Sequence, residues 1–426
     1  MGGAPAGRGP RALASRLVPG LSLERDLHLA PEVYRLELER IWRPAWLFAA
    51  HTAELRRPGE RTVFDVGDDS VLIVRGEDGE VRAFHNLCRH RGTRLAEPFE
   101  EHRRAGAGAS AGTGSFVRCP YHQWAYRLDG SLAACGGMED LEGLDRGTYG
   151  LLPVECAELG GLIFVRLEPP AEPGRPQRPA EVHELAPPLS PQGLGRAKVA
   201  YRQSYVVAAG WKILWENNRE CWHCHLGHPE YIKSHFDTLD TGSPAVRERA
   251  RRRTAAMLSA LGGLPAGDVF DGAGLSLFPS PGHSWSAHRT PLVEGYATES
   301  LDGAPLAPLM GDYQSYDVGV LRLRGLPNFW CHASADHAVT TRLVPAGVER
   351  TEVVVTWLVD EGAVEGRDYS LDRLLLVWRR TSEQDWALCE RNQRGVRSPA
   401  YVPGPLSGRH EANVTAFHEW YREMLA

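Results

Sequence analysis

Two short segments, each pairing one cysteine with one histidine, constrain this chain more than any other part of its 426 residues. The first is Cys88-Arg-His90, and the second is Cys119-Pro-Tyr-His122, with Trp124 close behind. Together they supply two thiolates and two imidazoles, the ligand set of a [2Fe–2S] centre with cysteines on one iron and histidines on the other. Zinc also accepts two Cys and two His, but zinc pairs usually read C-x-x-C and H-x-x-x-H. The mixed halves therefore favour an iron–sulfur cluster over zinc.

A second group of candidate ligands lies in residues 211–229, which read WKILWENNRECWHCHLGHP. The first half of this segment has a helical pattern. Asn217, Glu220 and His223 are three residues apart, so on a helix they would share one face and converge on a site.

His228 follows His223 by five residues, a separation of about 140° on an ideal helix. Gly227 and Pro229 indicate that the helix ends here, which could swing His228 back toward His223. Two histidines of this kind with a distant carboxylate are the minimum for a 2-His-1-carboxylate triad. That triad leaves positions on Fe(II) open for O₂ and substrate.

These motifs resemble those of the Rieske-type non-haem iron oxygenases, α-subunit class. Residues 86–92 (NLCRHRG) and 119–124 (CPYHQW) match the cluster loops of that family, and residues 216–229 match its iron-binding segment. The resemblance implies two cofactors, a Rieske [2Fe–2S] cluster and a mononuclear Fe(II). It also implies site residues: Cys88, His90, Cys119 and His122 for the cluster, His223 and His228 for the iron, and Glu220 with Asn217 as catalytic residues.

The third iron ligand is expected on a helix near the C-terminus. Residues 381–395 resemble the family's C-terminal helix, in which the position of Asp385 is the aspartate ligand. Glu383 and Glu390 are expected to be solvated on the surface of the same helix. Spacing alone does not choose among these acids, so Asp385 rests on the resemblance.

Three further side chains of the iron-binding segment have alternative roles. His225 is a second candidate for the distal histidine, but the resemblance favours His228. Cys221 and Cys224 form a C-x-x-C, a spacing used for zinc and for redox work. We expect them instead to pack as cysteines beside the iron.

The chain is predicted to be an α+β protein. Strand patterns with turns between them dominate residues 59–167, and the resemblance adds a helix-grip type catalytic domain with an antiparallel sheet and a long C-terminal helix. The expected helices are 31–42 and 371–392, and the expected catalytic strands are 199–207, 338–345 and 351–359. The expected domains are a disordered tail (1–25), an N-terminal helical segment packing on the catalytic domain (26–58), the Rieske domain (59–168), a Pro-rich linker (169–191) and the catalytic domain (192–426).

Composition excludes some classes of function. The net charge is −6 and the basic residues are scattered, so no nucleic-acid partner is expected. No apolar run approaches a membrane span, and residues 1–16 lack the apolar core of a secretory signal. The cysteines outside the cluster motifs show no disulfide framework, which fits a cytoplasmic enzyme. Residues 103–112, rich in Gly and Ala, are interpreted as a flexible insertion between the cluster loops.

The expected activity is oxygenation. One electron would pass from the cluster to the mononuclear iron of a neighbouring subunit, an arrangement that the family achieves as a homotrimer, with Glu220 joining the two centres. The chain has no nucleotide fingerprint, so a separate NAD(P)H-dependent reductase with flavin and iron–sulfur centres is expected. Two simpler functions are alternatives. An electron carrier would use the cluster but would leave the triad without a role, and a zinc-binding scaffold would explain the Cys and His residues without any iron.

The substrate expectation is an N-methyl group. Residues 216–221, 288–292, 357–369 and 398–405 resemble the glycine betaine demethylating branch, whose members oxidise an N-methyl carbon and release formaldehyde. The alternative is a monooxygenase for another small molecule, such as a natural-product intermediate or an aromatic compound. An aromatic cage would hold a trimethylammonium group, and Arg289 or His288 could hold a carboxylate. The candidate cage residues are Phe270, Phe278, Trp285, Tyr313, Tyr316 and Trp330.

Overall fold

The structure is a computed structural model that describes residues 18–98, 114–138, 140–168, 185–236, 243–269 and 284–425. The chain divides into two compact units, one formed by Met1–Trp42 with Glu181–Ala426 and the other by Arg43–Ala180. Residues 1–17 of the expected tail, the expected insertion and most of the Pro-rich linker lie outside the described residues. The rest of the expected disordered tail is ordered: Leu23 is buried, and Ser22 exchanges hydrogen bonds with Gly404. The second unit starts at Arg43 and not at residue 59, because β1 (Leu47–His51) pairs with β9 (Leu162–Arg166).

The unit Arg43–Ala180 is built from two antiparallel sheets. The larger sheet has the order β1-β9-β8-β4-β3-β2, and the smaller has the order β5-β6-β7. Leu72 and Phe84 from the larger sheet share one apolar core with Trp124 and Tyr126. The remaining strands are β2 (Arg61–Val66), β3 (Asp69–Arg75), β4 (Val81–His85), β5 (Phe116–Arg118), β6 (Ala125–Arg127), β7 (Leu132–Ala134) and β8 (Pro153–Leu159).

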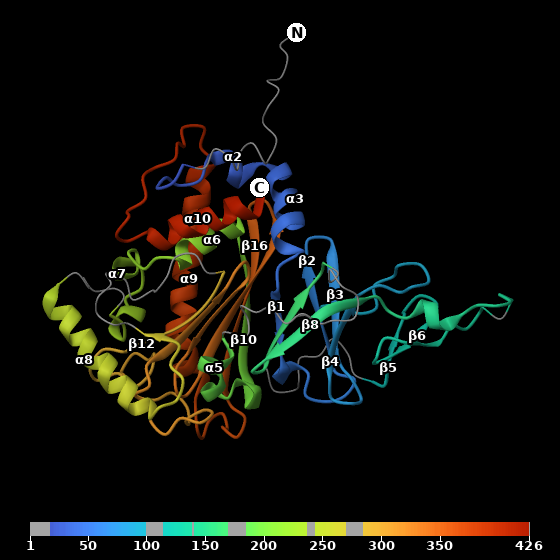
Figure 1. The fold of residues 1–426 in the computed structure, drawn as a ribbon, viewed down its shortest axis with the longest axis horizontal. Helices are drawn as coiled ribbons and strands as arrows, with labels where there is room; N and C mark the ends of the chain where they lie inside the picture. The colour runs from blue at the N-terminus through green and yellow to red at the C-terminus, as the bar shows by residue number, and fades with distance from the viewer. Residues whose placement is uncertain are drawn as a thin grey trace, which may run out of the picture. The chain divides into compact units, whose positions relative to one another are not determined.

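The other unit is organised around a seven-stranded sheet with the order β10-β16-β15-β14-β13-β12-β11 (Figure 1). All neighbouring strands are antiparallel except the short pair β11 and β12. The expected catalytic strands are present, and 338–345 with 351–359 form the β15–β16 hairpin. The strands are β10 (Ala197–Val207), β11 (Asp268–Val269), β12 (Trp285–Thr290), β13 (Val320–Gly325), β14 (Phe329–Ala333), β15 (Ala338–Gly347) and β16 (Arg350–Asp360).

The long helix α9 (Leu371–Val396) packs against this sheet (Figure 1). Its buried positions recur every three or four residues, as an amphipathic helix requires. The ring of Trp378 lies 4.1 Å from that of His332 on β14, centroid to centroid. The largely antiparallel sheet with a long helix packed against it confirms the predicted α+β fold class. Helix α9 begins at the expected residue, Leu371.

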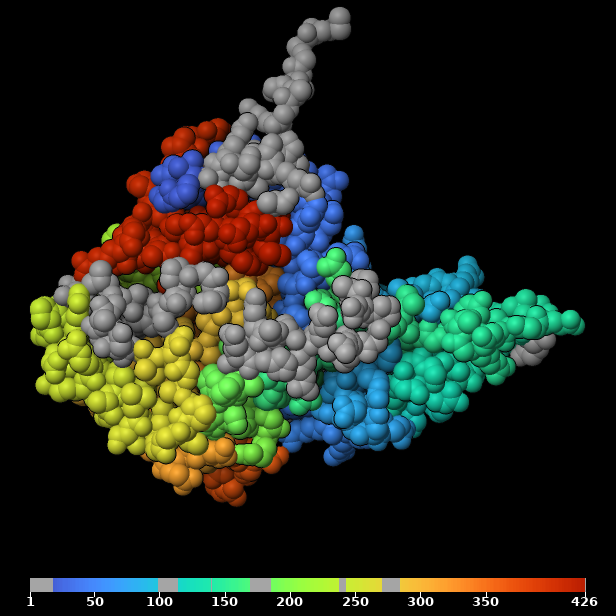
Figure 2. Space-filling view, viewed as in Figure 1, coloured from blue at the N-terminus to red at the C-terminus, as the bar shows by residue number. Residues whose placement is uncertain are grey.

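Shorter helices complete this unit. The expected helix 31–42 is present as α3 (Pro31–Glu37), continued by a π-helical turn (Leu38–Trp42). Within the expected Pro-rich linker (169–191), Ala186–Leu189 form the single helical turn α5, because proline is tolerated in a helix's first turn. Helix α8 lies on the surface, yellow-green in Figure 2, and buries only one stripe of side chains. The other helices are α2 (Arg25–Leu29), α6 (Trp211–Asn218), α7 (Cys224–Gly227), α8 (Pro244–Leu261) and α10 (Ala412–Leu425).

Candidate cluster loops and metal centre

Two loops of the same shape carry the four predicted cluster ligands. In each loop the cysteine carbonyl accepts a hydrogen bond from the amide four residues on, and the cysteine amide donates to the carbonyl five residues on. The four hydrogen bonds are Gly92 N to Cys88 O (2.9 Å), Cys88 N to Thr93 O (2.8 Å), Gln123 N to Cys119 O (3.2 Å) and Cys119 N to Trp124 O (2.8 Å). Gly92 and Gln123 both have positive φ, which is rare for a residue such as Gln. The two loops therefore form matching turns.

The cysteine and histidine side chains of these loops differ in solvent exposure. Cys88 and Cys119 are 2% and 1% exposed, whereas His90 and His122 are only partly buried. The two imidazole rings lie 4.7 Å apart, centroid to centroid, and His90 stacks on Trp124 at 4.9 Å. This arrangement could hold a two-iron cluster, with an inner iron bound by the thiolates and an outer iron bound by the imidazoles.

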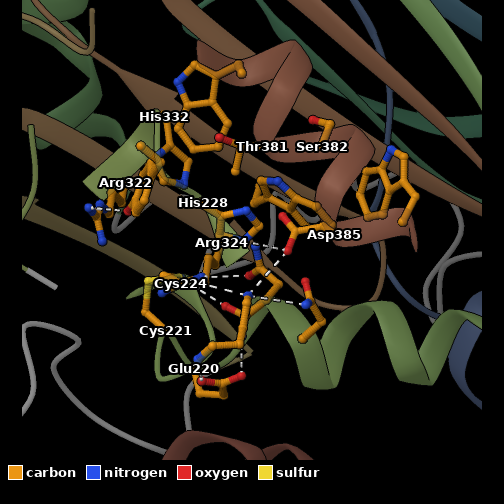
Figure 3. A pocket seen from close by; sticks show the side chains of 17 residues that line it. Glu220, Cys221, Cys224, His228, Arg322, Arg324, His332, Thr381, Ser382 and Asp385 are labelled. Carbon is orange, nitrogen blue, oxygen red and sulfur yellow. Dashed lines mark hydrogen bonds and ion pairs between the residues drawn. A yellow bond between two sulfur atoms is a disulfide. The ribbon is translucent and has the colours of Figure 1, made fainter. Parts of the chain in front are cut away.

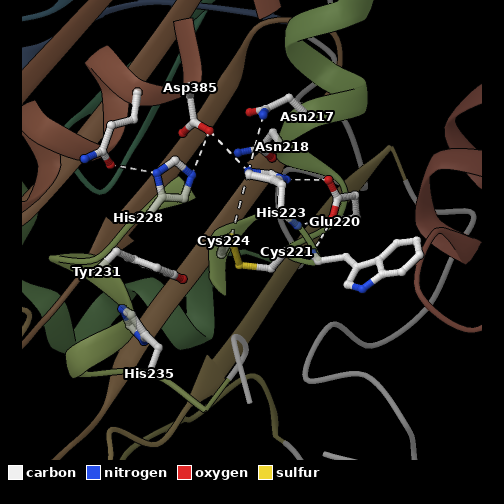
Figure 4. Close-up of a disulfide and its surroundings, with 12 residues drawn as sticks. Asn217, Asn218, Glu220, Cys221, His223, Cys224, His228, Tyr231, His235 and Asp385 are labelled. Carbon is white, nitrogen blue, oxygen red and sulfur yellow. Dashed lines mark hydrogen bonds and ion pairs between the residues drawn. A yellow bond between two sulfur atoms is a disulfide. The ribbon is translucent and has the colours of Figure 1, made fainter. Parts of the chain in front are cut away.

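The predicted triad is brought together in the other unit. His228 Nε2 lies 2.9 Å from Asp385 Oδ1, and His223 Nε2 lies 3.3 Å from the same oxygen (Figures 3 and 4). The opposite nitrogen of each ring is also held. Glu220 Oε1 accepts a hydrogen bond from His223 Nδ1, and Gln384 Oε1 accepts a hydrogen bond from His228 Nδ1 at 2.9 Å. Each Nε2 thus faces the carboxylate, so the three side chains could bind one metal ion.

The chain reaches this geometry through a turn and not through one helix face. Helix α6 ends at Asn218, so Asn217, Glu220 and His223 do not share the face that was expected. The three side chains still meet, because the chain turns after the helix ends. Glu220 accepts a hydrogen bond from His223 Nδ1, and Asn217 Nδ2 lies 3.3 Å from His223 Nε2. His228 caps α7 in a non-helical conformation, which brings it back as Gly227 and Pro229 indicated.

The electrostatics of the triad suit a cation. Burial alone would raise the pKa of Asp385, but hydrogen bonds from His223 and His228 outweigh it and lower that pKa. Burial would lower the pKa of His223, but Asp385 and Glu220 raise it to about 10. The site therefore stabilises positive charge at the point where the two Nε2 atoms and the carboxylate meet.

The two cysteines beside His223 are not the separate packing residues that were expected. Cys221 and Cys224 form a disulfide, because the turn brings their Cα atoms to 5.0 Å (Figure 4). The sulfur of Cys224 lies 3.9 Å from His223 Nε2. His225 is exposed, whereas His228 is buried beside Asp385. The geometry thus favours His228 over His225.

A cavity of about 570 Å³, including its opening to solvent, lies next to the triad and is lined by the residues of Figure 3. The sheet contributes Arg322, Arg324, Trp330 and His332, and α9 contributes Trp378, Thr381, Ser382 and Trp386. Tyr231 also lines it. The cavity thus brings aromatic and cationic side chains together beside the triad.

Of the expected cage residues that the structure describes, one lines the cavity and three do not. Trp330 lines the cavity, but Trp285, Tyr313 and Tyr316 are not among its lining residues, and Phe270 and Phe278 lie outside the described residues. Sequence reasoning missed Tyr231, Trp378 and Trp386. The sequence does contain a signal for these three residues. Tyr231 follows His228 by three residues, and on the helix of Asp385, Trp378 lies seven residues before it and Trp386 one residue after it.

The side chains expected to bind a substrate carboxylate also lie away from the cavity. The Arg289 guanidinium donates to Tyr313 Oη (2.7 Å) and to the Val318 carbonyl (3.0 Å), and neither Arg289 nor His288 lines the cavity. The cations that do line it are Arg322 and Arg324.

Two family models match the chain. The model "Ring hydroxylating alpha subunit (catalytic domain)" matches residues 194–426, and the model "Rieske [2Fe-2S] domain" matches residues 45–144. The chain therefore belongs to the Rieske non-haem iron oxygenases, as an oxygenase α subunit. The cofactors of this class are a Rieske [2Fe–2S] cluster and a mononuclear iron, and the enzyme is an oxidoreductase.

Curated relatives are similar over most of the chain. The glycine betaine monooxygenase oxygenase subunit of Chromohalobacter salexigens is 37% identical over 412 residues, covering 95% of this chain and 86% of the relative. That of Pseudomonas aeruginosa is 34% identical over 411 residues, covering 95% and 89%.

Solved structures share the fold. The quaternary ammonium Rieske monooxygenase CntA in complex with L-carnitine superposes with a TM-score of 0.67 at 19% identity, covering 98% of this chain and 99% of that one. Naphthalene 1,2-dioxygenase from Rhodococcus gives 0.62 at 21% identity, covering 95% and 94%. Within the described residues, no helix combines the length and the apolar character needed to cross a membrane.

Proposed function

We propose that this subunit hydroxylates an N-methyl group of a small quaternary or methylated amine similar to glycine betaine, which then releases formaldehyde. The observation that carries the proposal is the cavity beside the triad, where four aromatic side chains gather, namely Tyr231, Trp330, Trp378 and Trp386. The names of the relatives support the same substrate class.

The aromatic side chains provide what a trimethylammonium group requires. Such a group cannot donate hydrogen bonds, so aromatic faces within about 6 Å bind it best. The rings of Tyr231 and Trp378 lie 5.7 Å apart, centroid to centroid, and those of Trp330 and Trp386 lie 6.5 Å apart. Tyr231 also lies 6.3 Å from the ring of His228. A methyl carbon held by these rings would therefore be close to the metal centre.

The proposed ligand roles follow the geometry. Cys88, His90, Cys119 and His122 would hold the cluster, and His223, His228 and Asp385 would hold Fe(II), which supplies O₂ activation when bound. Glu220 and Gln384 bond the Nδ1 atoms of the two histidines, which leaves each Nε2 for the metal. Asn217 Nδ2 lies 3.3 Å from His223 Nε2, so Asn217 would lie beside the bound metal.

The overall reaction balances with an external reductant. One N-methyl group, O₂, two electrons and two protons give an N-hydroxymethyl group and water. The N-hydroxymethyl ammonium then breaks its carbon–nitrogen bond, giving the demethylated amine, formaldehyde and one proton. The electrons would come from NAD(P)H through a separate flavin and iron–sulfur reductase. "Oxygenase subunit" in the names of the relatives supports such a division of labour.

We further propose a homotrimer in which the cluster of one subunit serves the iron of the next. Glu220 would then connect the outer histidine of a neighbouring cluster to His223. One solved relative, CntA, is described as showing inter-subunit electron transfer, which supports this arrangement. Sedimentation of the purified protein measures the assembly directly.

A substrate panel tests the proposed activity. Glycine betaine, carnitine, choline and stachydrine are each supplied with O₂, NADH and a surrogate reductase, and formaldehyde and the demethylated amine are measured. We expect turnover of at least one of them with equimolar formaldehyde. If protein with full cluster and mononuclear iron turns over none of the four, the proposal fails in favour of another small-molecule substrate.

Changing Glu220 to glutamine tests its proposed role. The variant is expected to keep both metal contents but to lose turnover by roughly 10- to 100-fold, the usual effect of removing a carboxylate that orients a ligand histidine. Stopped-flow oxidation of the reduced cluster by O₂ and substrate should slow by a similar factor. The control is Glu383→Gln, an exposed acid on α9 that should leave both rates unchanged. Normal cluster oxidation in Glu220→Gln would contradict the assigned role.

A further inference from the structure

A disulfide to which the proposed function assigns no role lies beside the triad. Cys221 and Cys224 both line the cavity, and His223 lies between them in sequence. The sulfur of Cys224 is 3.9 Å from His223 Nε2, the ring nitrogen that faces Asp385 (Figure 4). The opposite nitrogen of that ring is hydrogen-bonded to Glu220. Cys224 therefore approaches the histidine from the side on which the metal would bind.

The distance is close to that of a thiolate ligand. A tetrahedral zinc ion with Zn–N of about 2.0 Å and Zn–S of about 2.3 Å holds the nitrogen and the sulfur about 3.5 Å apart. The 3.9 Å between Cys224 Sγ and His223 Nε2 is only slightly longer. The ligand atoms of His223, Cys224 and His228 also lie within 4.8 Å of one another. With Asp385 they make four ligands, the number that a closed zinc site uses.

The disulfide prevents Cys224 from serving as that fourth ligand. A metal binds cysteine as the thiolate, and a sulfur bonded to a second sulfur does not carry that charge. The oxidised site therefore offers the two histidines and the carboxylate alone. A site of three protein ligands leaves positions open on the metal, as an oxygenase requires.

Backbone hydrogen bonds hold Cys224 in place independently of the disulfide. Its amide donates to the Cys221 carbonyl at 3.2 Å, and the His228 amide donates to the Cys224 carbonyl at 2.9 Å. Cys224 is only 5% exposed, so its side chain has little room to turn away. After reduction, the free thiol would therefore stay beside His223 Nε2.

We propose that reduction of the Cys221–Cys224 disulfide converts the oxygenase site into a closed zinc site, with the Cys224 thiolate as its fourth ligand. This inference rests on the proposed function, because it uses the same triad. Zinc suits the reduced site, since it binds thiolate and imidazole together and such ligands favour it over Fe(II). Four protein ligands leave a tetrahedral ion no position for O₂, so reduction would stop turnover.

The chemical steps balance with a dithiol as the reductant. The dithiol gives two electrons and two protons to the disulfide, whose sulfur–sulfur bond breaks, and it becomes a disulfide itself. Zn²⁺ then displaces the proton of the Cys224 thiol, which passes to solvent as the zinc–sulfur bond forms. Cys221 lines the cavity and is only partly buried, so a small reductant can reach it.

Two matched variants separate the thiolate ligand from the disulfide. Cys221→Ala and Cys224→Ala both lose the disulfide, but only Cys221→Ala keeps the thiol beside His223. Each protein, with its cluster intact and its mononuclear iron removed by a chelator, is loaded with one equivalent of Zn²⁺. X-ray absorption at the zinc edge, which does not detect the cluster irons, should show one sulfur at about 2.3 Å in Cys221→Ala and none in Cys224→Ala.

Zinc affinity gives a second measurement, by competition with a chromophoric chelator. Cys221→Ala should bind Zn²⁺ at least about 100-fold more tightly than Cys224→Ala, because losing a ligand costs more than the 10- to 100-fold effect of losing a group that orients one. The wild type purified without reductant should behave like Cys224→Ala. After treatment with tris(2-carboxyethyl)phosphine, which reduces the disulfide as water supplies the oxygen of the phosphine oxide, it should behave like Cys221→Ala.

The outcomes separate this inference from the proposed function. If Cys221→Ala shows no zinc-bound sulfur, or if the two variants bind zinc equally, the role of Cys224 is overturned and the triad stands. If alkylation and mass spectrometry find both thiols free in the wild type purified without reductant, the redox control is overturned. If the oxidised wild type binds mononuclear iron but demethylates no amine, the proposed function fails and the zinc site stands.

Discussion

Replacing His228 with alanine is expected to remove about one iron in three from the purified protein while the cluster spectrum persists. The cluster holds two irons and the proposed triad holds one. His228 is a triad member whose Nε2 lies 2.9 Å from Asp385, and its ring is buried. Loss of a ligand should exceed the 10- to 100-fold effect of losing a group that merely orients one, so turnover should fall by at least about 100-fold. Iron analysis and the optical spectrum measure both parts.

The matched control lies three residues away in the same short segment. His225→Ala removes the same side chain from an exposed position, so iron content and turnover should stay near those of the wild type. If His225→Ala loses the iron and His228→Ala retains it, the ligand assignment is wrong. Asp385→Asn should behave like His228→Ala, because an amide neutralises the carboxylate that both Nε2 atoms face.

Replacing Cys88 with alanine is expected to abolish the cluster and with it all reductase-driven turnover. Cys88 is buried, and its loop has the same hydrogen-bond pattern as that of Cys119, so Cys88→Ala leaves only one of the two proposed thiolate ligands in place. The purified variant should lack acid-labile sulfide and the electron paramagnetic resonance signal of a reduced Rieske centre. An intact signal in this variant would remove Cys88 from the ligand set.

A second cysteine of the same unit controls for the loss of a buried thiol. Cys135 belongs to the same apolar core as Cys88 but lies outside both cluster loops. Cys135→Ala should lose some stability through the small cavity it leaves, while its sulfide content and cluster signal remain. The comparison separates ligand loss from core damage.

Local sequence was sufficient to locate the segments that carry the proposed ligands. Each cluster loop closes within six residues through its own backbone hydrogen bonds, so Cys88 to Thr93 and Cys119 to Trp124 carry their geometry with them. The same holds for His223 and His228, which Gly227 and Pro229 bring together. Strands such as β16 and the helix α9 were also predictable, because their period-2 and period-3.6 patterns are local properties.

The choice of Asp385 depended on information that spacing does not contain. Helix α9 also carries Glu383 and Glu390, and only the packing of the helix shows which acid meets the histidines. Asp385 lies 162 residues after His223 in sequence, yet the two share a contact of 3.3 Å. The resemblance to a family pointed to this position, whereas composition and periodicity could not.

The walls of the cavity were decided by tertiary structure alone. The sequence suggested Arg289, but strand pairing places Arg322 and Arg324 at the cavity and Arg289 against Tyr313. Because successive side chains of a strand point to opposite faces, a shift of one residue exchanges the two sides. The motifs thus indicated the two cluster loops and the two candidate iron-binding histidines, because the contacts within these segments are local. Which substrate can reach them depends on β13, β14 and α9, whose side chains meet only after the sheet has formed.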